Sequence, residues 1–310
     1  MDTRRIGSLT VSVVGIGCNN FGIRLDASGT AAVVNAALDA GVNFFDTADI
    51  YGRTQSEVLL GRALGARRRD VVVATKFGMK VDDTKRGAKP AYVRQACEDS
   101  LRRLGTDYID LYQLHEPDPT VPIADTLGAL DELVKAGKVR EIGCSNFSVE
   151  QIREAEGAVK PGAARFVSVQ NRYSLLHREP EEDGVLAECE LRGLAFLPFF
   201  PLESGLLTGK VRRGQPVPAG SRLTEERYSG RFLDDRRVDT VEELIAYAGG
   251  RGHTVLDLAF GWLLAHAPVA SVIAGATKPE QVRANVAAAS AWRLGEAELA
   301  EVDAVMLRTA

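Results

Sequence analysis

Cysteine and histidine are scarce in this chain, which has only four of each among 310 residues. No two cysteines form a C-x-x-C pair; they are Cys18, Cys97, Cys144 and Cys189. Small secreted domains carry much denser cysteine frameworks, so this usage favours free thiols and a reducing, cytoplasmic location. The histidines are equally scattered, whereas a zinc site needs clustered ligands. The sequence therefore predicts neither a disulfide framework nor a bound metal.

Long apolar runs and an excess of charge of one sign are also absent. Lys and Arg total 38 against 42 Asp and Glu, and the formal net charge of −4 is not typical of a nucleic-acid-binding protein. No apolar run is long enough to cross a membrane. Arg4-Arg5 before an apolar stretch resembles a targeting signal, but glycine and serine interrupt the stretch and no A-x-A site follows. With 45% hydrophobic residues, the composition predicts a globular protein with neither nucleic acid nor membrane as a partner.

What the chain does contain is a regular alternation of short β-branched apolar runs with amphipathic stretches. The runs predict strands at 13–17, 43–46, 71–76, 109–115, 141–145, 166–170, 195–199 and 271–274. The stretches between them predict helices at 31–40, 56–64, 91–104, 123–136, 149–158, 182–192, 281–289 and 296–307, and a helical region within 241–267. Eight strands, each followed by a helix, are typical of an α/β protein with a closed (β/α)8 TIM barrel. We expect one such domain over residues 1–310.

Two features stand outside this repeat. Residues 4–6 and 9–11 flank Gly7-Ser8 and predict an N-terminal β-hairpin. The segment 201–240 after the seventh strand is long, polar and rich in Gly, Pro and Arg, which predicts a functional loop. A doubly wound dinucleotide-binding fold is the alternative architecture, but the first strand runs into G-I-G-C-N-N at 15–20 and lacks the third glycine of that fingerprint.

Polar side chains stand at the ends of successive predicted strands, where a barrel of this type carries its active site. The second strand ends at Asp46, with Tyr51 in the loop beyond; the third ends at Lys76 and the fourth at His115. A nearby ammonium lowers the pKa of a tyrosine, and Asp46 would keep Lys76 charged and oriented. Tyr51 could then donate a proton to a carbonyl oxygen that also accepts a hydrogen bond from His115.

These four residues lie in blocks that resemble the aldo-keto reductase family over essentially the whole chain. The first block reads G-V-N-F-F-D-T-A-D-I-Y-G at 41–52, and further blocks lie at 101–115, 138–147, 206–210 and 275–278. The sequence most resembles the bacterial aryl-alcohol-dehydrogenase-like and channel-β-subunit-like branches. The resemblance implies reversible, NADPH-dependent reduction of aldehydes or ketones to alcohols. It also implies that Asp46, Tyr51, Lys76 and His115 form the catalytic tetrad.

The resemblance further implies which residues hold the cofactor. Ser145, Asn146 and Gln170 would bind the nicotinamide carboxamide, and Phe199 takes the place of the Tyr or Trp that usually stacks on the ring. The loop on the pyrophosphate side would comprise Phe200, Pro201, Leu202, Ser204, Gly205, Lys210 and Arg222. Cofactor contacts are also expected at Cys18 and Asn19, after the first strand, and at Gly275, Thr277, Lys278, Gln281 and Asn285, after the eighth.

The block after the eighth strand bears on which cofactor is used. Pro279 suits the first turn of a helix, and Thr277 is the expected N-cap. The free N–H groups of that helix, with the charge of Lys278, would bind a dianion such as the 2′-phosphate of NADPH. No acidic residue lies between Gly275 and Pro279. The pattern therefore predicts NADPH rather than NADH.

The substrate is expected to be a small carbonyl compound, in a pocket bordered by Asn20, Phe21, Phe77 and Glu116. Phe21 and Phe77 suit an apolar or aromatic aldehyde, and Glu116 disfavours a strongly anionic one. Two other functions stay open. One is an NADPH-binding regulatory protein with vestigial catalysis, which the intact tetrad argues against. The other is an isomerase or aldolase on the same barrel, which would leave the residues between Gly275 and Asn285 without a role.

Overall fold

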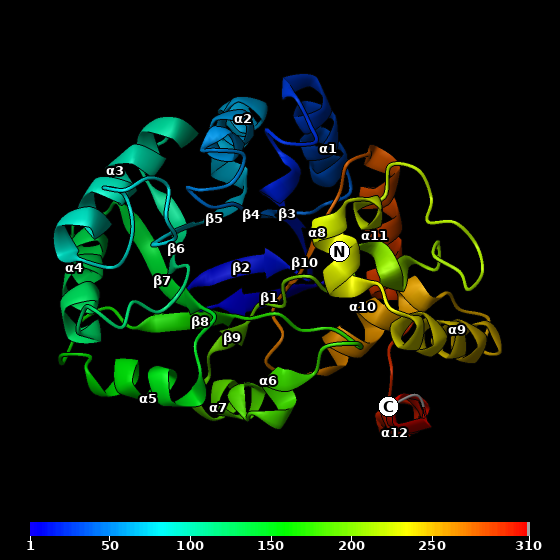
Figure 1. Ribbon diagram of the computed structural model, residues 1–310. Coiled ribbons are helices and arrows are strands. Elements are labelled where there is room, and N and C mark those ends of the chain that lie inside the picture. Colours follow the sequence, from blue (N-terminus) through cyan, green and yellow to red (C-terminus); the bar gives the residue numbers. More distant parts are fainter. Residues whose placement is uncertain (309–310) are drawn as a thin grey trace.

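An eight-stranded parallel sheet forms the centre of the computed structural model, which describes residues 1–308 (Figure 1). In spatial order its strands are β10 (Val272–Gly275), β3 (Val14–Gly17), β4 (Phe44–Asp46), β5 (Val72–Phe77), β6 (Ile109–Leu114), β7 (Val139–Ser145), β8 (Phe166–Gln170) and β9 (Ala195–Phe196). A bridge between Phe196 and Val269 brings the two edges together. The predicted TIM-barrel fold is confirmed, and each strand overlaps its predicted range.

Helices surround the strands (Figure 1). They are α1 (Ala27–Asp39), α2 (Gln55–Leu64), α3 (Pro90–Leu104), α4 (Ile123–Lys135), α5 (Val149–Gly157), α6 (Glu179–Glu182), α7 (Val185–Arg192), α8 (Glu226–Phe232), α9 (Asp235–Gly249), α10 (Val255–Ala265), α11 (Pro279–Ala291) and α12 (Glu296–Arg308). Polar caps set several starts: the Asp26 side chain accepts from the Gly29 N–H, and Ser148 forms a capping box with Gln151. Within residues 1–308, none of the helices combines the length and apolar character needed to cross a membrane.

The predicted hairpin is present and covers the N-terminal ends of the barrel strands. Strands β1 (Thr3–Ile6) and β2 (Leu9–Ser12) pair antiparallel around Gly7, whose φ of 55° suits glycine. The apolar side chains of the hairpin pack against the starts of β4, β5 and β9. Arg4 donates to the carbonyl oxygens of Leu264 (2.6 Å) and His266 (3.3 Å). The opposite end of the barrel is thereby left as the open mouth.

Two predicted segments differ from the structure. The single helix expected at 182–192 is two helices, α6 and α7, because Gly184 between them adopts a φ of 79°. The loop expected at 201–240 contains short 3₁₀ helices at Glu203–Thr208 and Arg222–Thr224, helix α8 and the start of α9. The Asp234 side chain accepts from the Arg237 N–H (2.8 Å) and so caps α9 several residues before its apolar face begins.

Candidate active site

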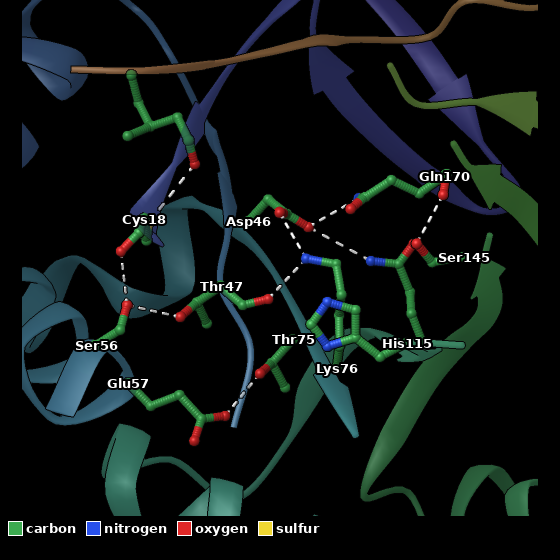
Figure 2. A network of polar contacts seen from close by, with 12 residues as sticks. Cys18, Asp46, Thr47, Ser56, Glu57, Thr75, Lys76, His115, Ser145 and Gln170 are labelled. Carbon is green, nitrogen blue, oxygen red and sulfur yellow. Dashed lines mark hydrogen bonds and ion pairs between the residues drawn. The ribbon is translucent and has the colours of Figure 1, made fainter. Parts of the chain in front are cut away.

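A cavity of about 1040 Å³ opens at the C-terminal ends of the strands. Asp46, Ser145 and Gln170 are the last residues of β4, β7 and β8, and all three line it. Tyr51 and His115, from the loops after β4 and β6, line the same cavity. The strand-end prediction thus brings its residues to one mouth, as Figure 2 shows for most of them.

Lys76 lies beneath the cavity floor, on β5, and its side chain is 0% exposed. Its Nζ lies 2.6 Å from Asp46 Oδ2 and donates to the Thr47 carbonyl (2.9 Å; Figure 2). Burial is the largest single influence and disfavours the ammonium, but the interactions of Lys76 with Asp46 and Tyr51 together outweigh it, so the pKa of Lys76 lies above its usual value. Gln170 Nε2 donates to the other Asp46 oxygen (3.0 Å). The carboxylate therefore holds Lys76 charged and in place.

Tyr51 lies between this ion pair and His115. Lys76 Nζ is 5.2 Å from the centre of the Tyr51 ring, and the His115 ring meets it edge-on at 5.7 Å. The expected lowering of the Tyr51 pKa is wrong for the protein without ligand. Although the ring keeps partial exposure to the cavity, desolvation of the hydroxyl raises its pKa, and the Lys76 ammonium offsets only part of that rise. Tyr51 is consequently a neutral phenol that still carries the proton it would donate.

His115 is a neutral imidazole. Burial, and then the Lys76 ammonium, lower its pKa well below the ordinary value. Its Nδ1 is buried without a hydrogen-bond partner in the described part of the chain, and Asn146 Nδ2 donates to its backbone carbonyl (2.9 Å). A neutral imidazole carries one N–H, so His115 can donate a single hydrogen bond to a ligand.

Ser145, Asn146 and Gln170 form the adjoining wall. The Ser145 hydroxyl donates to the Gln170 carbonyl (2.7 Å), and Asn146 Nδ2 donates to Ser145 Oγ (3.2 Å). Asn146 has a φ of 60°, a left-handed conformation that asparagine tolerates better than most residues. This backbone conformation turns the amide back toward His115.

The other residues expected to hold the cofactor line the same cavity, with one exception. Cys18 does not line it: the side chain is 0% exposed, and the Cys18 carbonyl accepts from the Ser56 hydroxyl (2.9 Å; Figure 2). The residues that do line it are Asn19, Phe199, Phe200, Pro201, Leu202, Ser204, Gly205, Lys210, Arg222, Gly275, Thr277, Lys278, Gln281 and Asn285.

The cavity fits a long polar ligand such as a nicotinamide dinucleotide. Ser204 Oγ and Asn285 Nδ2 are buried and have no hydrogen-bond partner within residues 1–308. Buried polar groups are rarely left unpaired, so these two atoms point to a polar ligand. Lys210 and Lys278 are exposed on the cavity wall and form no ion pair in the described part of the chain. Arg222 Nη2 donates to Asn19 Oδ1 (2.8 Å) and Asn20 Oδ1 (2.6 Å), and so spans the wall.

The start of α11 differs from its prediction by one residue. The N-cap is Lys278, not Thr277, because the helix begins at Pro279. Gln281 Oε1 accepts from the backbone N–H groups of Thr277 (2.7 Å) and Lys278 (3.2 Å), and from the Thr277 hydroxyl (3.1 Å). A phosphate at this helix start would take over donors that the glutamine now engages.

The expected substrate residues are only partly brought together. Asn20 lines the cavity, but Phe21 and Phe77 are 0% exposed in the core, where Phe77 stacks on Tyr112 at 4.7 Å. Glu116 is exposed outside the cavity, so it gives no argument against an anionic substrate.

Sequence reasoning missed two arginines that line the cavity, Arg24 and Arg231. Arg24 pairs with Glu225 at 3.2 Å, and the Arg231 guanidinium lies over the Phe200 ring at 5.9 Å. Arg24 lies in a loop that no sequence pattern marked. Arg231 lies on α8, within the arginine-rich segment 201–240 that was expected to be functional, but nothing in the pattern singled it out from its neighbours. Within residues 1–308, no group of His, Cys, Asp or Glu side chains is arranged to hold a metal ion.

A barrel whose mouth carries a buried lysine–aspartate pair, a phenol, a neutral imidazole and a large cavity with unpaired polar atoms in its wall defines a class of oxidoreductase. The sequence model of the Aldo/keto reductase family matches residues 13–306, and the chain belongs to this family. It is therefore an oxidoreductase that acts on carbonyl groups, in a family that generally uses nicotinamide cofactors.

Individual relatives agree with this family. A probable voltage-gated potassium channel subunit beta of Oryza sativa subsp. japonica is 36% identical over 86% of this chain and 84% of its own length. A probable aldo-keto reductase 1 of Glycine max is 35% identical over 94% of this chain and 84% of its own. Among solved structures, the glycerol dehydrogenase AKR11B4 from Gluconobacter oxydans superposes with a TM-score of 0.85 at 31% identity, covering 100% of this chain and 96% of that one.

Proposed function

We propose that the protein is a cytoplasmic, NADPH-dependent reductase of small aldehydes or ketones, working reversibly with Tyr51 as general acid and base. One observation carries the proposal. The Lys76–Asp46 pair (2.6 Å), in which Lys76 is fully buried, lies beside a phenol that borders a large cavity. Burying an ammonium is costly, and a core position would be better filled by an apolar side chain if it served packing alone.

NADPH, when bound, supplies a hydride to the carbonyl carbon. The Tyr51 hydroxyl donates its proton to the carbonyl oxygen, and His115, neutral because its pKa is lowered, donates a hydrogen bond to the same oxygen. The Lys76 ammonium stabilises the phenolate that Tyr51 becomes, and Asp46 keeps that ammonium in place. In alcohol oxidation the phenolate takes the proton back.

The residues around the cavity support NADPH as the cofactor. Ser145, Asn146 and Gln170 offer the donors and acceptors that a carboxamide needs, and Phe199 offers a face for the ring. Lys278, Arg222 and the Thr277 hydroxyl offer the charge and donors for a 2′-phosphate. A small carbonyl compound would then occupy the space beside Tyr51, His115 and Asn20.

The second candidate is an NADPH-binding regulatory protein, favoured by the 36% identity to the probable channel subunit. Stopped-flow oxidation of bound NADPH by a panel of aldehydes, ketones, sugars and quinones separates the two. The reductase predicts multiple turnovers with at least one class of carbonyl. Binding of NADPH without turnover by any of them would favour the regulatory protein.

A further inference from the structure

The turn that follows Phe199 has a backbone conformation that its sequence does not favour. Phe200, Glu203 and Ser204 have φ values of 52°, 45° and 56°, and Gly205 follows at 107°. Residues other than glycine, asparagine and aspartate rarely adopt this region, and they keep it only where the surroundings enforce it. Something must therefore hold this turn.

The buried Glu203 carboxylate holds this turn in place. Its side chain is 0% exposed, and its two oxygens accept from one edge of the Arg172 guanidinium, from Nη2 and from Nε at 3.3 Å. The Ser174 hydroxyl also donates to it (2.9 Å). Arg172 itself is 11% exposed. A forked pair of this kind fixes orientation as well as distance, because two parallel hydrogen bonds restrict rotation.

The same short segment holds Phe199 through its backbone. The Phe199 N–H donates to the Asn171 carbonyl (3.1 Å), and the Tyr173 N–H donates to the Phe199 carbonyl (3.3 Å). Residues 171–174, which continue β8, thus bind Phe199 through backbone hydrogen bonds and Glu203 through the side chains of Arg172 and Ser174. The turn between them has little freedom to move relative to β8.

Glu203 itself does not line the cavity, although its neighbours Leu202 and Ser204 on either side do. Ser204 is left with its hydroxyl buried and without a partner in the described residues. The left-handed conformation therefore sends the carboxylate back toward β8 and leaves Leu202, Ser204 and Gly205 on the cavity wall.

We propose that Glu203 is a positioning residue, which through its ion pair with Arg172 fixes the turn from Phe199 to Gly205 in the form that binds the nicotinamide cofactor. This inference rests on the proposed function. Glu203 touches neither cofactor nor substrate and takes no part in proton transfer. Its loss therefore affects cofactor affinity and leaves the chemical step unchanged.

The test is Glu203→Gln, which keeps the shape and removes the charge. We expect the Kd for NADPH, measured by fluorescence titration, to rise about tenfold, equivalent to about 1.4 kcal/mol. The KM for NADPH should rise with it, while kcat at saturating NADPH stays within about threefold of the unmodified protein. A general structural defect would instead lower the active fraction, and hence kcat, without changing Kd.

Glu57→Gln is the matched control. Glu57 is also 0% exposed, lies 2.6 Å from Arg103 Nε and accepts from the Thr75 hydroxyl (2.6 Å), but it does not line the cavity. This variant should lose stability with an unchanged Kd for NADPH. If Glu203→Gln does not fold, Arg172→Lys keeps the positive charge, loses the forked geometry and should raise the Kd in the same direction.

The outcomes separate the two proposals. If the unmodified protein binds NADPH and the folded Glu203 or Arg172 variant binds it equally well, the positioning role is wrong and the proposed function stands. An equal rise of Kd in Glu57→Gln would also overturn the positioning role. If the unmodified protein binds neither NADPH nor NADH, the proposed function fails, and this inference fails with it.

Discussion

Replacing Lys76 by methionine should damage stability and catalysis through one cause, the loss of the ammonium that pairs with Asp46 at 2.6 Å. Removing one partner of a buried ion pair costs about 3–5 kcal/mol. Asp46 keeps hydrogen bonds from Gln170 (3.0 Å) and Gln113 (3.4 Å), so we expect the lower end, about 3 kcal/mol. Urea denaturation of Lys76→Met gives this loss directly.

Catalysis by Lys76→Met should fall about 10²–10⁴-fold, because no ammonium would stabilise the Tyr51 phenolate. The double variant Asp46→Asn/Lys76→Met removes both charges and should regain much of the lost stability without regaining activity. Lys138→Met, which breaks an exposed ion pair with Glu98, is the control and should change stability far less. Full stability or full activity in Lys76→Met would refute this reasoning, as would a double variant no more stable than the single one.

Three further outcomes follow from the same structure. Phe199→Ala should raise the Kd for NADPH about threefold to tenfold by removing a stacking face, and an unchanged Kd in fluorescence titration would make Phe199 a packing residue only. Lys278→Ala should lower the ratio of kcat/KM for NADPH to that for NADH about tenfold; equal use of both cofactors by the unmodified protein, or an unchanged ratio, would reject the 2′-phosphate site. Burial, and then the charge of Glu57, raise the pKa of Asp49 to about 7, so folding holds a proton there and stability should fall as pH rises from about 4 to 7. Asp49→Asn should remove that decline and gain up to about 4 kcal/mol at pH 8, measured by denaturation at pH 5 and 8; the same decline in the variant would contradict it.

The sequence could predict the barrel and the meeting of Asp46, Tyr51, Lys76 and His115 near its mouth because both follow from order along the chain. A β-branched run followed by an amphipathic stretch is a local signal, and a parallel barrel brings all strand ends to one mouth. The positions of Asp46, Lys76 and His115 at the ends of predicted strands were enough to place them near the mouth. The cofactor contacts came from resemblance, and most of those residues do line the cavity.

What the sequence could not predict depends on burial. Glu203 reads as one charge in a polar loop, yet its side chain is 0% exposed and paired. The direction of the Tyr51 pKa depends on how desolvation compares with one ammonium, and only the three-dimensional site gives that balance. Phe21 and Phe77 read equally well as pocket or core residues, and their complete burial decides for the core.

The measurement that tests the central claim most directly is single-turnover oxidation of bound NADPH by an aldehyde, in the unmodified protein and in Tyr51→Phe. Phenylalanine keeps the ring against His115 and removes only the proton donor. We expect the rate to fall about 10²–10⁴-fold while the Kd for NADPH stays unchanged. A rate in Tyr51→Phe close to that of the unmodified protein would contradict the assignment of Tyr51 as the general acid.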